Sequence, residues 1–453
     1  MTADLLFPAG FQWGASSSAY QIEGAVREGG REESIWDVFC QRPGTIADGS
    51  SGEFACDGYH RTRDDIAIMK DLGLTSYRFS IAWPRIIPTG RGAVNQAGID
   101  HYKHFVNDLL EAGIRPMVTL YHWDLPRPLQ SHGGWASRDT AARFGEYAHV
   151  VARALAPEVT DWSTINEPSI ASFLGCYLGI HAPGIRDLKT TLATAHHLLL
   201  GHAEGMEALR AEMRPGSRAG IVLVVQPVEP ATDSQADLEA AHRTDGFMNR
   251  WFLDPLYRGT YPDDMVEIFG DAMPEIANSD FARISQPTDF LGLNYYSPMV
   301  MRWDPSMAPL HGMMAQRPGA PTNHLGWTID PNGLHQVLMR LHSEYQVGEM
   351  VIAENGGCFQ DHPRERLDGT LEIDDRDRER YLLEHLVACH RAIADGVHLT
   401  GYFVWSFLDV FEWNNGYTSP FGIVHVDRDT QARTIKRSGT WYAQVTRDHG
   451  VSS

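Results

Sequence analysis

The chain of 453 residues has few of the features that mark disulfide-stabilised, zinc-binding or membrane proteins. Its cysteines are few, odd in number and widely separated, and no CxxC pair occurs, so neither a disulfide framework nor a zinc ribbon is indicated. It lacks an apolar run of about 18 residues, which argues against a membrane-spanning helix. The stretch from Met1 to Gly14 has neither a basic segment nor a long apolar one, so we predict no signal peptide and a cytoplasmic protein.

Positive charge is also scarce. Lys and Arg number 38 against 58 Asp and Glu, which gives a net charge of −20. Lysines are the rarest of these, four against 34 arginines, a bias that we attribute to the base composition of the genome. No basic run occurs, so we predict no nucleic-acid partner and expect neutral ligands. The oligomeric state stays open.

Eight short apolar or β-branched runs alternate with segments of helical periodicity. Strands that alternate with helices are typical of parallel βαβ units, and eight such units predict a closed (β/α)8 barrel over residues 1–453, as a single domain. The predicted helices include Asp64–Leu72, Tyr102–Ala112 and Tyr381–Asp395, each followed by a stopping glycine. The predicted strands are Phe11–Ser18, Ser76–Trp83, Arg115–Trp123, Asp161–Asn166, Ala219–Gln226, Asp289–Tyr296, Glu349–Glu354 and Thr400–Ser406.

The units are longer than a minimal βαβ unit requires, so the extra residues belong to long loops. Arg27–Tyr59 and Ser297–Asn332 are the clearest of these. We interpret the charge run Asp374–Arg380 as the solvated start of a helix. We interpret His196 and His197 as residues of the packed interior and of the surface. Adjacent helix residues point in different directions, so the two make poor joint ligands for a metal.

Polar and aromatic residues follow most of the predicted strands. In a (β/α)8 barrel the carboxyl ends of the strands and the loops after them form the active site, so these residues should converge on one pocket. They lie in Tyr20–Glu23, Tyr121–Asp124, Ile165–Pro168, Asn294–Tyr296, Glu354–Asn355 and Trp405–Trp413. Carboxylates and amides bind pairs of hydroxyl groups, and indole rings cover the C–H faces of sugars, so we predict a pyranose site. Clustered metal ligands and phosphate-binding glycine motifs are missing from the sequence, so we predict neither metal nor cofactor.

Glu167 and Glu354 form the predicted catalytic pair. Cleavage of a glycosidic bond needs one carboxylic acid to protonate the leaving oxygen and one carboxylate on the opposite face of the ring. Arg78 is predicted to keep Glu354 ionised, and the charge of Glu354 is expected to raise the pKa of Glu167 so that it stays protonated.

The chain resembles glycoside hydrolase family 1, the retaining β-glycosidases with a (β/α)8 barrel. The resemblance runs over six motifs in order: Phe11–Gly24, Ser34–Phe39, Thr164–Pro168, Ile352–Gly356, Trp405–Trp413 and Arg437–Tyr442. It implies Glu167 as the acid/base and Glu354 as the nucleophile of a β-glucosidase that acts on small β-glucosides and oligosaccharides such as cellobiose. It implies a substrate-binding set of Gln21, His122, Trp123, Asn166, Asn294, Tyr296, Trp327, Trp405, Glu412, Trp413 and Phe421, in which Tyr296 donates to the nucleophile and Trp327 lies nearer the aglycone.

The chain departs from the family pattern in ways that leave alternatives open. Ala353 replaces the usual threonine before the nucleophile, Ser169 replaces a common tryptophan of the aglycone site, and Gly58 replaces a common histidine. One alternative is a transglycosylating β-glycosidase of broad glucoside, galactoside and fucoside range, since Ser169 could admit other acceptors. Another is a sugar-binding protein with impaired catalysis. Glu412 and Trp413 argue against a phosphorylated sugar, because a carboxylate at that position repels phosphate.

Overall fold

The computed structural model describes residues 4–365, 369 and 371–452, and its centre is a closed barrel of eight parallel strands in that part of the chain. The barrel order, β2-β3-β4-β5-β6-β8-β11-β14 with β14 closing on β2, follows the sequence, as consecutive βαβ units require. The predicted fold class is therefore confirmed. Each predicted strand matches one barrel strand, and the ends agree within two residues except at β3, which ends three residues before the prediction. These strands are β2 (Gln12–Ser16), β3 (Ser76–Ser80), β4 (Arg115–Tyr121), β5 (Asp161–Asn166), β6 (Arg218–Val224), β8 (Phe290–Tyr295), β11 (Met350–Asn355) and β14 (Leu399–Trp405).

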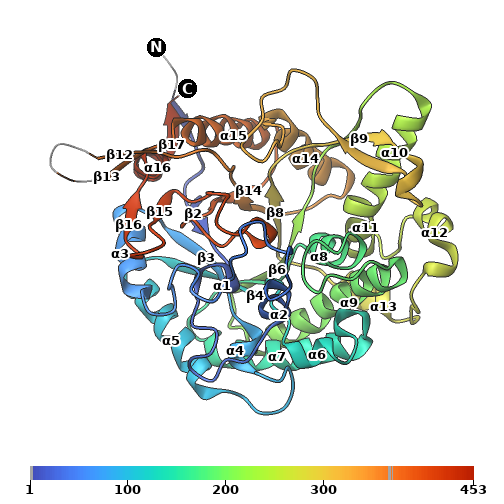
Figure 1. Cartoon of the computed structure of the whole chain (residues 1–453), viewed down its shortest axis with the longest axis horizontal. Coiled ribbons are helices and arrows are strands. Elements are labelled where there is room, and N and C mark those ends of the chain that lie inside the picture. Colours follow the sequence, from blue (N-terminus) through green and yellow to red (C-terminus); the bar gives the residue numbers. More distant parts are fainter. Residues whose placement is uncertain (1–3, 366–368, 370, 453) are drawn as a thin grey trace.

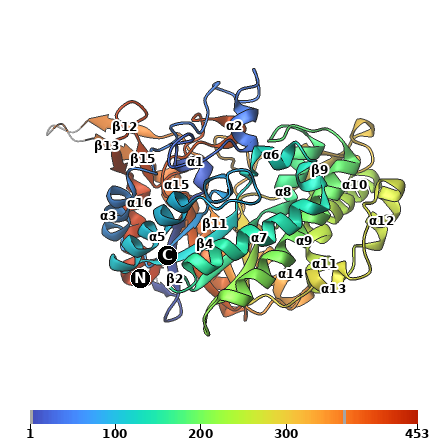
Figure 2. The same ribbon diagram turned by 90° about the horizontal axis from the view of Figure 1, so that it is seen from below.

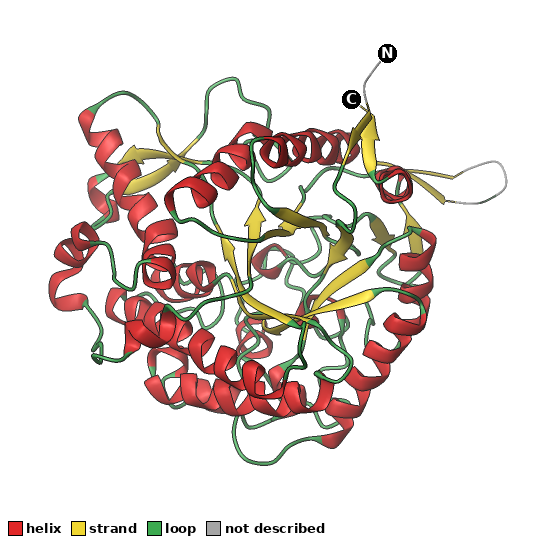
Figure 3. Cartoon of the chain, turned by 180° about the vertical axis from the view of Figure 1, so that it is seen from behind, coloured by secondary structure: helices red, strands yellow, loops and turns green. Residues whose placement is uncertain are grey.

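A ring of long helices surrounds the barrel, as Figures 1 and 3 show. The three helices predicted from periodicity are present, although α5 begins six residues before its predicted start and α15 five before. The ring consists mainly of α3 (Thr62–Asp71), α5 (Gln96–Glu111), α7 (Arg138–Leu155), α9 (Leu188–Glu212), α11 (Trp251–Tyr257), α14 (Pro331–Glu344), α15 (Arg376–Ala394) and α16 (Arg437–Asp448).

The strands separate two apolar cores. Met117, Phe290, Val351 and Phe403 come from four barrel strands and form a small cluster of their own. Their neighbours in sequence, such as Val118 and Ile352, belong instead to the large cluster shared with the helices. Alternate residues of a strand point to opposite faces, so the small cluster fills the barrel interior and the large one lies between barrel and helices.

The loops at the carboxyl ends of the strands carry short elements of their own. Both long segments predicted as loops contain regular structure: Arg27–Tyr59 includes α2, and Ser297–Asn332 includes β9 and β10. Figure 2 shows α2 and the β12–β13 hairpin at the same, upper end of the barrel. The short helices are α1 (Ala19–Ile22), α2 (Ile35–Cys40), α4 (Trp83–Ile86), α6 (Arg127–Gln130), α8 (Pro168–Ser172), α10 (Gln235–Asp245), α12 (Asp263–Phe269) and α13 (Asp280–Ile284).

Small sheets complete the fold. The strand β1 (Asp4–Leu6) pairs with β17 (Gly450–Ser452), which brings the two ends of the described chain together. The others are β7 (Val228–Pro230), β9 (Met299–Trp303) and β10 (Gly312–Ala315), then β12 (His362–Glu365) with β13 (Leu371–Asp374), and β15 (Val424–Val426) with β16 (Arg433–Ile435). Among the described residues, no helix is both long enough and apolar enough to cross a bilayer.

Two predictions about polar residues are wrong in part. The charge run Asp374–Arg380 is not simply solvated, because Asp375 and Arg378 are fully buried and form an ion pair. His196 and His197 are both buried, so neither is a surface residue. His196 bonds Tyr261 and Asp280, and His197 bonds a backbone carbonyl. Sequence periodicity could not show this, because the burying partners come from distant segments.

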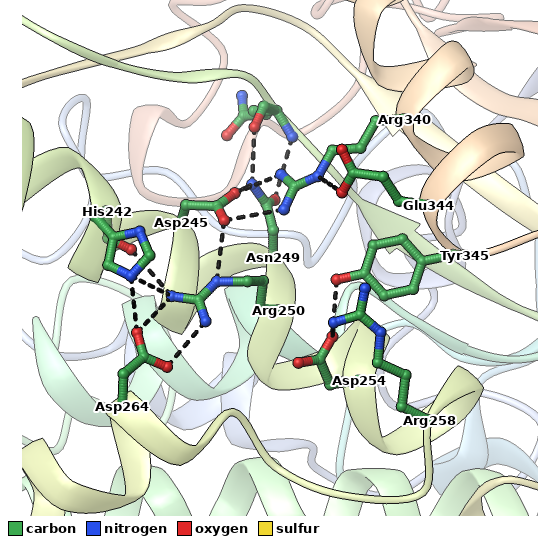
Figure 4. A network of polar contacts seen from close by, with 11 residues as sticks. His242, Asp245, Asn249, Arg250, Asp254, Arg258, Asp264, Arg340, Glu344 and Tyr345 are labelled. Carbon is green, nitrogen blue, oxygen red and sulfur yellow. Dashed lines mark hydrogen bonds and ion pairs between the residues drawn. The ribbon is translucent and has the colours of Figure 1, made fainter.

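A polar network joins the helices beside β6 (Figure 4). Asp245, at the end of α10, forms two hydrogen bonds with Arg340 of α14, 2.6 and 3.0 Å long. Arg250 binds both carboxylate oxygens of Asp264 in α12, at 2.9 and 2.8 Å. The π-helical turn Gly246–Arg250 lies between these pairs, and its Asn249 donates to the carbonyl of Gln226 at 2.8 Å, just after β6. The network thus ties three outer helices to one strand end.

Candidate active site

The barrel brings the two predicted catalytic glutamates to its carboxyl end. Glu167 directly follows β5 and Glu354 lies near the end of β11, and their exposed fractions are 5% and 3%. A chain of hydrogen bonds joins them. Arg78 bridges Glu354 and the Asn166 side chain, and Asn294 bridges Asn166 and Glu167.

Glu354 is held by two donors, both of them expected from the sequence. Arg78 Nη1 lies 2.5 Å from Oε1, and the Tyr296 hydroxyl donates to Oε2 over 2.6 Å. Burial, together with the charge of Glu354, raises the pKa of Tyr296 far above its usual value, so the phenol keeps its proton and remains a donor. An ionised, oriented carboxylate is what a nucleophile requires.

Among the described residues, Glu167 has fewer hydrogen-bond donors than Glu354 and no positively charged one. Its Oε1 accepts one hydrogen bond from Asn294 Nδ2, 2.8 Å away. Burial is the main cause that raises the pKa of Glu167 to about 8, and the negative charge of Glu354 adds to it. The sequence interpretation named only the neighbouring charge. Because desolvation opposes the charged form, Glu167 is protonated at neutral pH and can act as an acid.

His122 is a neutral ring at the inner wall. Burial, followed by the nearby charge of Arg78, holds the pKa of His122 well below its usual range. The side-chain oxygen Oδ1 of Asn166 accepts from Arg78 and Asn294, so the side-chain nitrogen Nδ2 is the group that faces His122 Nε2, at 3.2 Å. Nε2 therefore accepts and the ring proton sits on Nδ1, which has no partner among the described residues.

Tryptophans make up the rest of this wall. Trp405 and Trp413 both lie nearly parallel to the His122 ring, each with centroids 5.9 Å apart. Trp123 packs on Trp413 at 4.6 Å and donates its indole N–H to the Asn166 carbonyl over 2.9 Å. Trp36 packs behind Trp413 at 4.4 Å. The indole rings are therefore fixed before any ligand arrives.

Gln21 and Glu412 form a polar pair beside this wall. Gln21 Nε2 donates to Glu412 Oε2 at 3.2 Å and to the Phe411 carbonyl at 3.0 Å, while Ser18 donates to Gln21 Oε1 at 2.6 Å. Burial, and then the charge of Glu354, raises the pKa of Glu412 to about 8. The pair therefore offers both donors and acceptors for hydroxyl groups.

Trp327 and Phe421 lie nearer the rim. Their ring centroids are 6.1 Å apart, and the Tyr296 ring centroid lies 5.9 Å from that of Trp327 and 6.3 Å from that of Phe421. Trp327 is 36% exposed whereas Phe421 is buried. Trp327 thus lies on the solvent side of the nucleophile, the side expected for an aglycone.

The site holds unusual backbone conformations. Trp123, Glu167 and Trp413 all have positive φ, at 78°, 47° and 49°. Residues with a Cβ rarely adopt this region, and where they do the surrounding structure enforces it, often at functional sites. Gly356 is required for another reason: a Cβ there would lie 1.8 Å from the Trp405 carbonyl oxygen. The strand of the nucleophile and the strand that ends at Trp405 therefore meet at a glycine.

Several features of the site were not predicted. The Asn294–Glu167 bond depends on side-chain direction, and the cluster of Asp361, Asp409 and His425 unites residues far apart in sequence. Ser169 is only 2% exposed, so the missing tryptophan does not leave an open surface at that position.

Comparison with known proteins identifies the family. The sequence model named "Glycosyl hydrolase family 1" matches residues 4–451. The chain belongs to glycosyl hydrolase family 1. The family model spans the strands of the barrel together with every residue of the candidate site, so the resemblance seen in six motifs extends over the whole described chain.

Family 1 relatives match this chain along its full length. "Beta-glucosidase A" of Acetivibrio thermocellus is 45% identical over 98% of this chain and 99% of its own. "Thermostable beta-glucosidase B" of Thermobispora bispora is 46% identical over 99% of this chain and 92% of its own. The solved β-glucosidase of Thermotoga maritima in complex with glucoimidazole superposes with a TM-score of 0.94, at 41% identity over 99% of this chain and 100% of its own.

Proposed function

We propose that this family 1 protein is a retaining exo-β-glucosidase, with Glu354 as nucleophile and Glu167 as acid/base. The observation that carries the proposal is the contrast between two buried carboxyl groups in one site. Glu354 has a guanidinium and a phenol as donors, whereas Glu167 has a raised pKa and a single amide donor. Whole-chain relatives named β-glucosidase, and a structural neighbour that binds glucoimidazole, support β-glucosides as substrates.

In the first step a carboxylate oxygen of Glu354 attacks the anomeric carbon and forms an ester bond. The bond from that carbon to the aglycone oxygen breaks, and Glu167 delivers its proton to the departing oxygen. Arg78 and Tyr296 each hold one oxygen of the Glu354 carboxylate and so orient it for attack. The negative charge of Glu354 leaves with the aglycone oxygen and, once that oxygen takes the proton, remains on Glu167.

In the second step water replaces the aglycone. Esterified Glu354 no longer carries its negative charge, so the largest charge effect that raises the pKa of Glu167 is gone, and burial and Glu412 remain. Glu167 is by then ionised, accepts a proton from water, and the hydroxyl attacks the anomeric carbon. The ester bond breaks, free sugar leaves with the original β configuration, and both carboxyl groups return to their starting states.

The sugar binds through the polar and aromatic walls. Gln21 and Glu412 bind neighbouring hydroxyl groups, His122 and Asn166 face the inner side of the ring, and the indoles cover its C–H face. Trp123, Asn294 and Phe421 shape the same pocket, and Trp327 lies toward the aglycone. We assign the 4-hydroxyl to Gln21 and Glu412, which can accept this group in either its glucose or its galactose orientation. Small oligosaccharides such as cellobiose fit the proposal.

Two other functions receive less support. A preference for transglycosylation was based on space at Ser169, and that residue is buried. A non-catalytic sugar-binding protein would have no need of two buried glutamates of which one is held by Arg78 and Tyr296 and the other has a raised pKa. We also propose that residues 1–453 form a single domain, because one apolar cluster extends from Phe7 to Val451. A cytoplasmic location is proposed because all five cysteines, each within the described residues, are free thiols.

A chromogenic β-glucoside tests the activity directly. Wild-type protein should release the chromophore, and Glu354→Gln should reduce the rate by several orders of magnitude, because the amide is a poor nucleophile. Proton NMR of the first product should show the β anomer. Undiminished activity in Glu354→Gln, or an α anomer as first product, would refute the proposed mechanism. A panel of β-glucoside, β-galactoside, β-fucoside and cellobiose would define the sugar range.

A further inference from the structure

Lys436 has an unusual place in this chain. Four lysines occur, all in the described part of the structure, and Lys70, Lys103 and Lys189 are exposed whereas Lys436 is fully buried. In a protein where arginine supplies most positive charge, one lysine lies in the interior near the candidate site. A buried ammonium group is costly to desolvate unless anionic partners compensate for it.

The partners of Lys436 come from two different active-site loops. Its Nζ lies 2.7 Å from Asp361 Oδ2 and 2.7 Å from Asp409 Oδ1. Asp361 belongs to the loop that follows β11 and the nucleophile Glu354. Asp409 belongs to the loop that follows β14, three residues before Glu412. Lys436 itself directly precedes α16 and is the last residue of the segment that connects β14 to this helix.

Asp409 ties together the two ends of the loop after β14. Its Oδ1 accepts the backbone N–H of Gly422 over 2.9 Å, next to Phe421, and its Oδ2 lies 3.1 Å from His425 Nδ1. Burial alone would raise the pKa of Asp409, but Lys436, with His425 and Arg378, outweighs it and holds that pKa well below the usual range. The carboxylate is therefore ionised and fixed.

A second buried cation completes the network. Arg378 lies 3.2 Å from Asp361, pairs with Asp375, and donates to the Pro420 carbonyl at 2.8 Å. Asp361, Asp409 and His425 also lie close enough together to ligate a metal ion. Both carboxylates already bind the Lys436 ammonium, so a protein cation occupies the position between them.

We propose that Lys436 is a positioning residue, a clamp that fixes the loop after β14 relative to the loop that follows Glu354. The former loop begins after Trp405 and carries Glu412, Trp413 and Phe421, and the clamp sets these glycone-binding side chains in register with the nucleophile. A compact ammonium with three donors can bind two carboxylates from different directions, whereas a planar guanidinium favours two parallel bonds to one partner. The inference rests on the proposed function.

The test compares Lys436→Met with Lys70→Met, which makes the same change at an exposed lysine of α3. Two substrates are used: a chromogenic β-glucoside and its 4-deoxy analogue, which lacks the hydroxyl assigned to Gln21 and Glu412. Active enzyme is counted with a fluoroglycoside that traps the covalent intermediate. Lys436→Met should lower kcat/KM for the glucoside about 10- to 100-fold per active site, and much less for the 4-deoxy substrate. Lys70→Met should match wild type on both.

The ratio between substrates separates positioning from stability. A purely structural role would reduce the number of active molecules, or lower kcat/KM for both substrates by the same factor, and either result would overturn the proposal. If Lys436→Met does not fold, Asp361→Asn tests the same contact, and it should shift the substrate ratio in the same direction by a smaller factor. An inactive wild type would instead refute the proposed function itself.

Discussion

Asn294→Leu should move the alkaline limb of the pH–activity profile to higher pH. Glu167 must be protonated to act as the acid, so kcat/KM falls as pH rises through its pKa of about 8. The Asn294 amide donates to Glu167 over 2.8 Å and opposes the effects of burial and of Glu354. Leucine has similar size but no donor, so the ionised form of Glu167 loses its stabilising bond.

The size of the shift follows from that single hydrogen bond. A hydrogen bond to a charged group contributes about 1.5–3 kcal/mol, and one to a neutral group about 0.5–1.5 kcal/mol. The difference, about 1–1.5 kcal/mol, is the extra stabilisation of the carboxylate over the acid. One pKa unit corresponds to about 1.36 kcal/mol, so the limb should move by about one unit, to about pH 9.

The assay is kcat/KM for a chromogenic β-glucoside between about pH 5 and pH 10.5, with the released chromophore measured after quenching at fixed pH. Absolute rates can fall, because Asn294 also contacts Asn166, but the position of the limb does not depend on them. Asn332→Leu, at an exposed asparagine of α14, is the matched control and should leave the limb unchanged. A limb that stays near pH 8 in Asn294→Leu, or moves to lower pH, would show that the titrating acid is not Glu167.

Two further variants probe separate parts of the structure. Glu167→Gln should still form the glycosyl-enzyme from a substrate whose leaving group needs no proton, but hydrolysis of that intermediate should slow by about 10²–10⁴. Azide needs no general base, so it should restore turnover and give a glycosyl azide. The absence of this product would contradict the assignment of Glu167. Arg340→Met should lower the free energy of unfolding by about 1–3 kcal/mol without changing kcat/KM, because Asp245 loses one of its two arginine partners and keeps only Arg250. Arg340 helps to lower the pKa of Asp245 in the folded protein. The resulting contribution to stability is present above the pKa that Asp245 has in the unfolded chain, and it is lost as the pH falls and the carboxylate is protonated. The difference in melting temperature should therefore shrink below about pH 4, and a pH-independent difference would contradict this account.

The sequence predicted the barrel because its signals are local. Each strand is a short apolar run and each outer helix repeats at helical spacing, and both patterns result from burial against neighbours in a layered fold. The long loops were harder, because α2 contacts α6, and β9 and β10 pair with each other and pack on α10, which are contacts between separate segments. Asp375 and Arg378 show the same limit: a charged run is indistinguishable from a solvated helix start until its distant partners are known.

Glu354 and Glu167 could be proposed from the sequence alone, since each follows a buried strand and the carboxyl ends of parallel strands meet at one end of a barrel. The family resemblance added the tryptophans, Gln21 and Glu412 by motif. Only the tertiary structure decided how these groups act on one another: that burial is the larger cause of the raised pKa of Glu167, that Asn294 opposes it, and that Lys436 joins two loops. Desolvation and Coulomb energies depend on distance and surroundings in space, and these are set by residues from separate segments of the chain, such as Asn294 and Glu167.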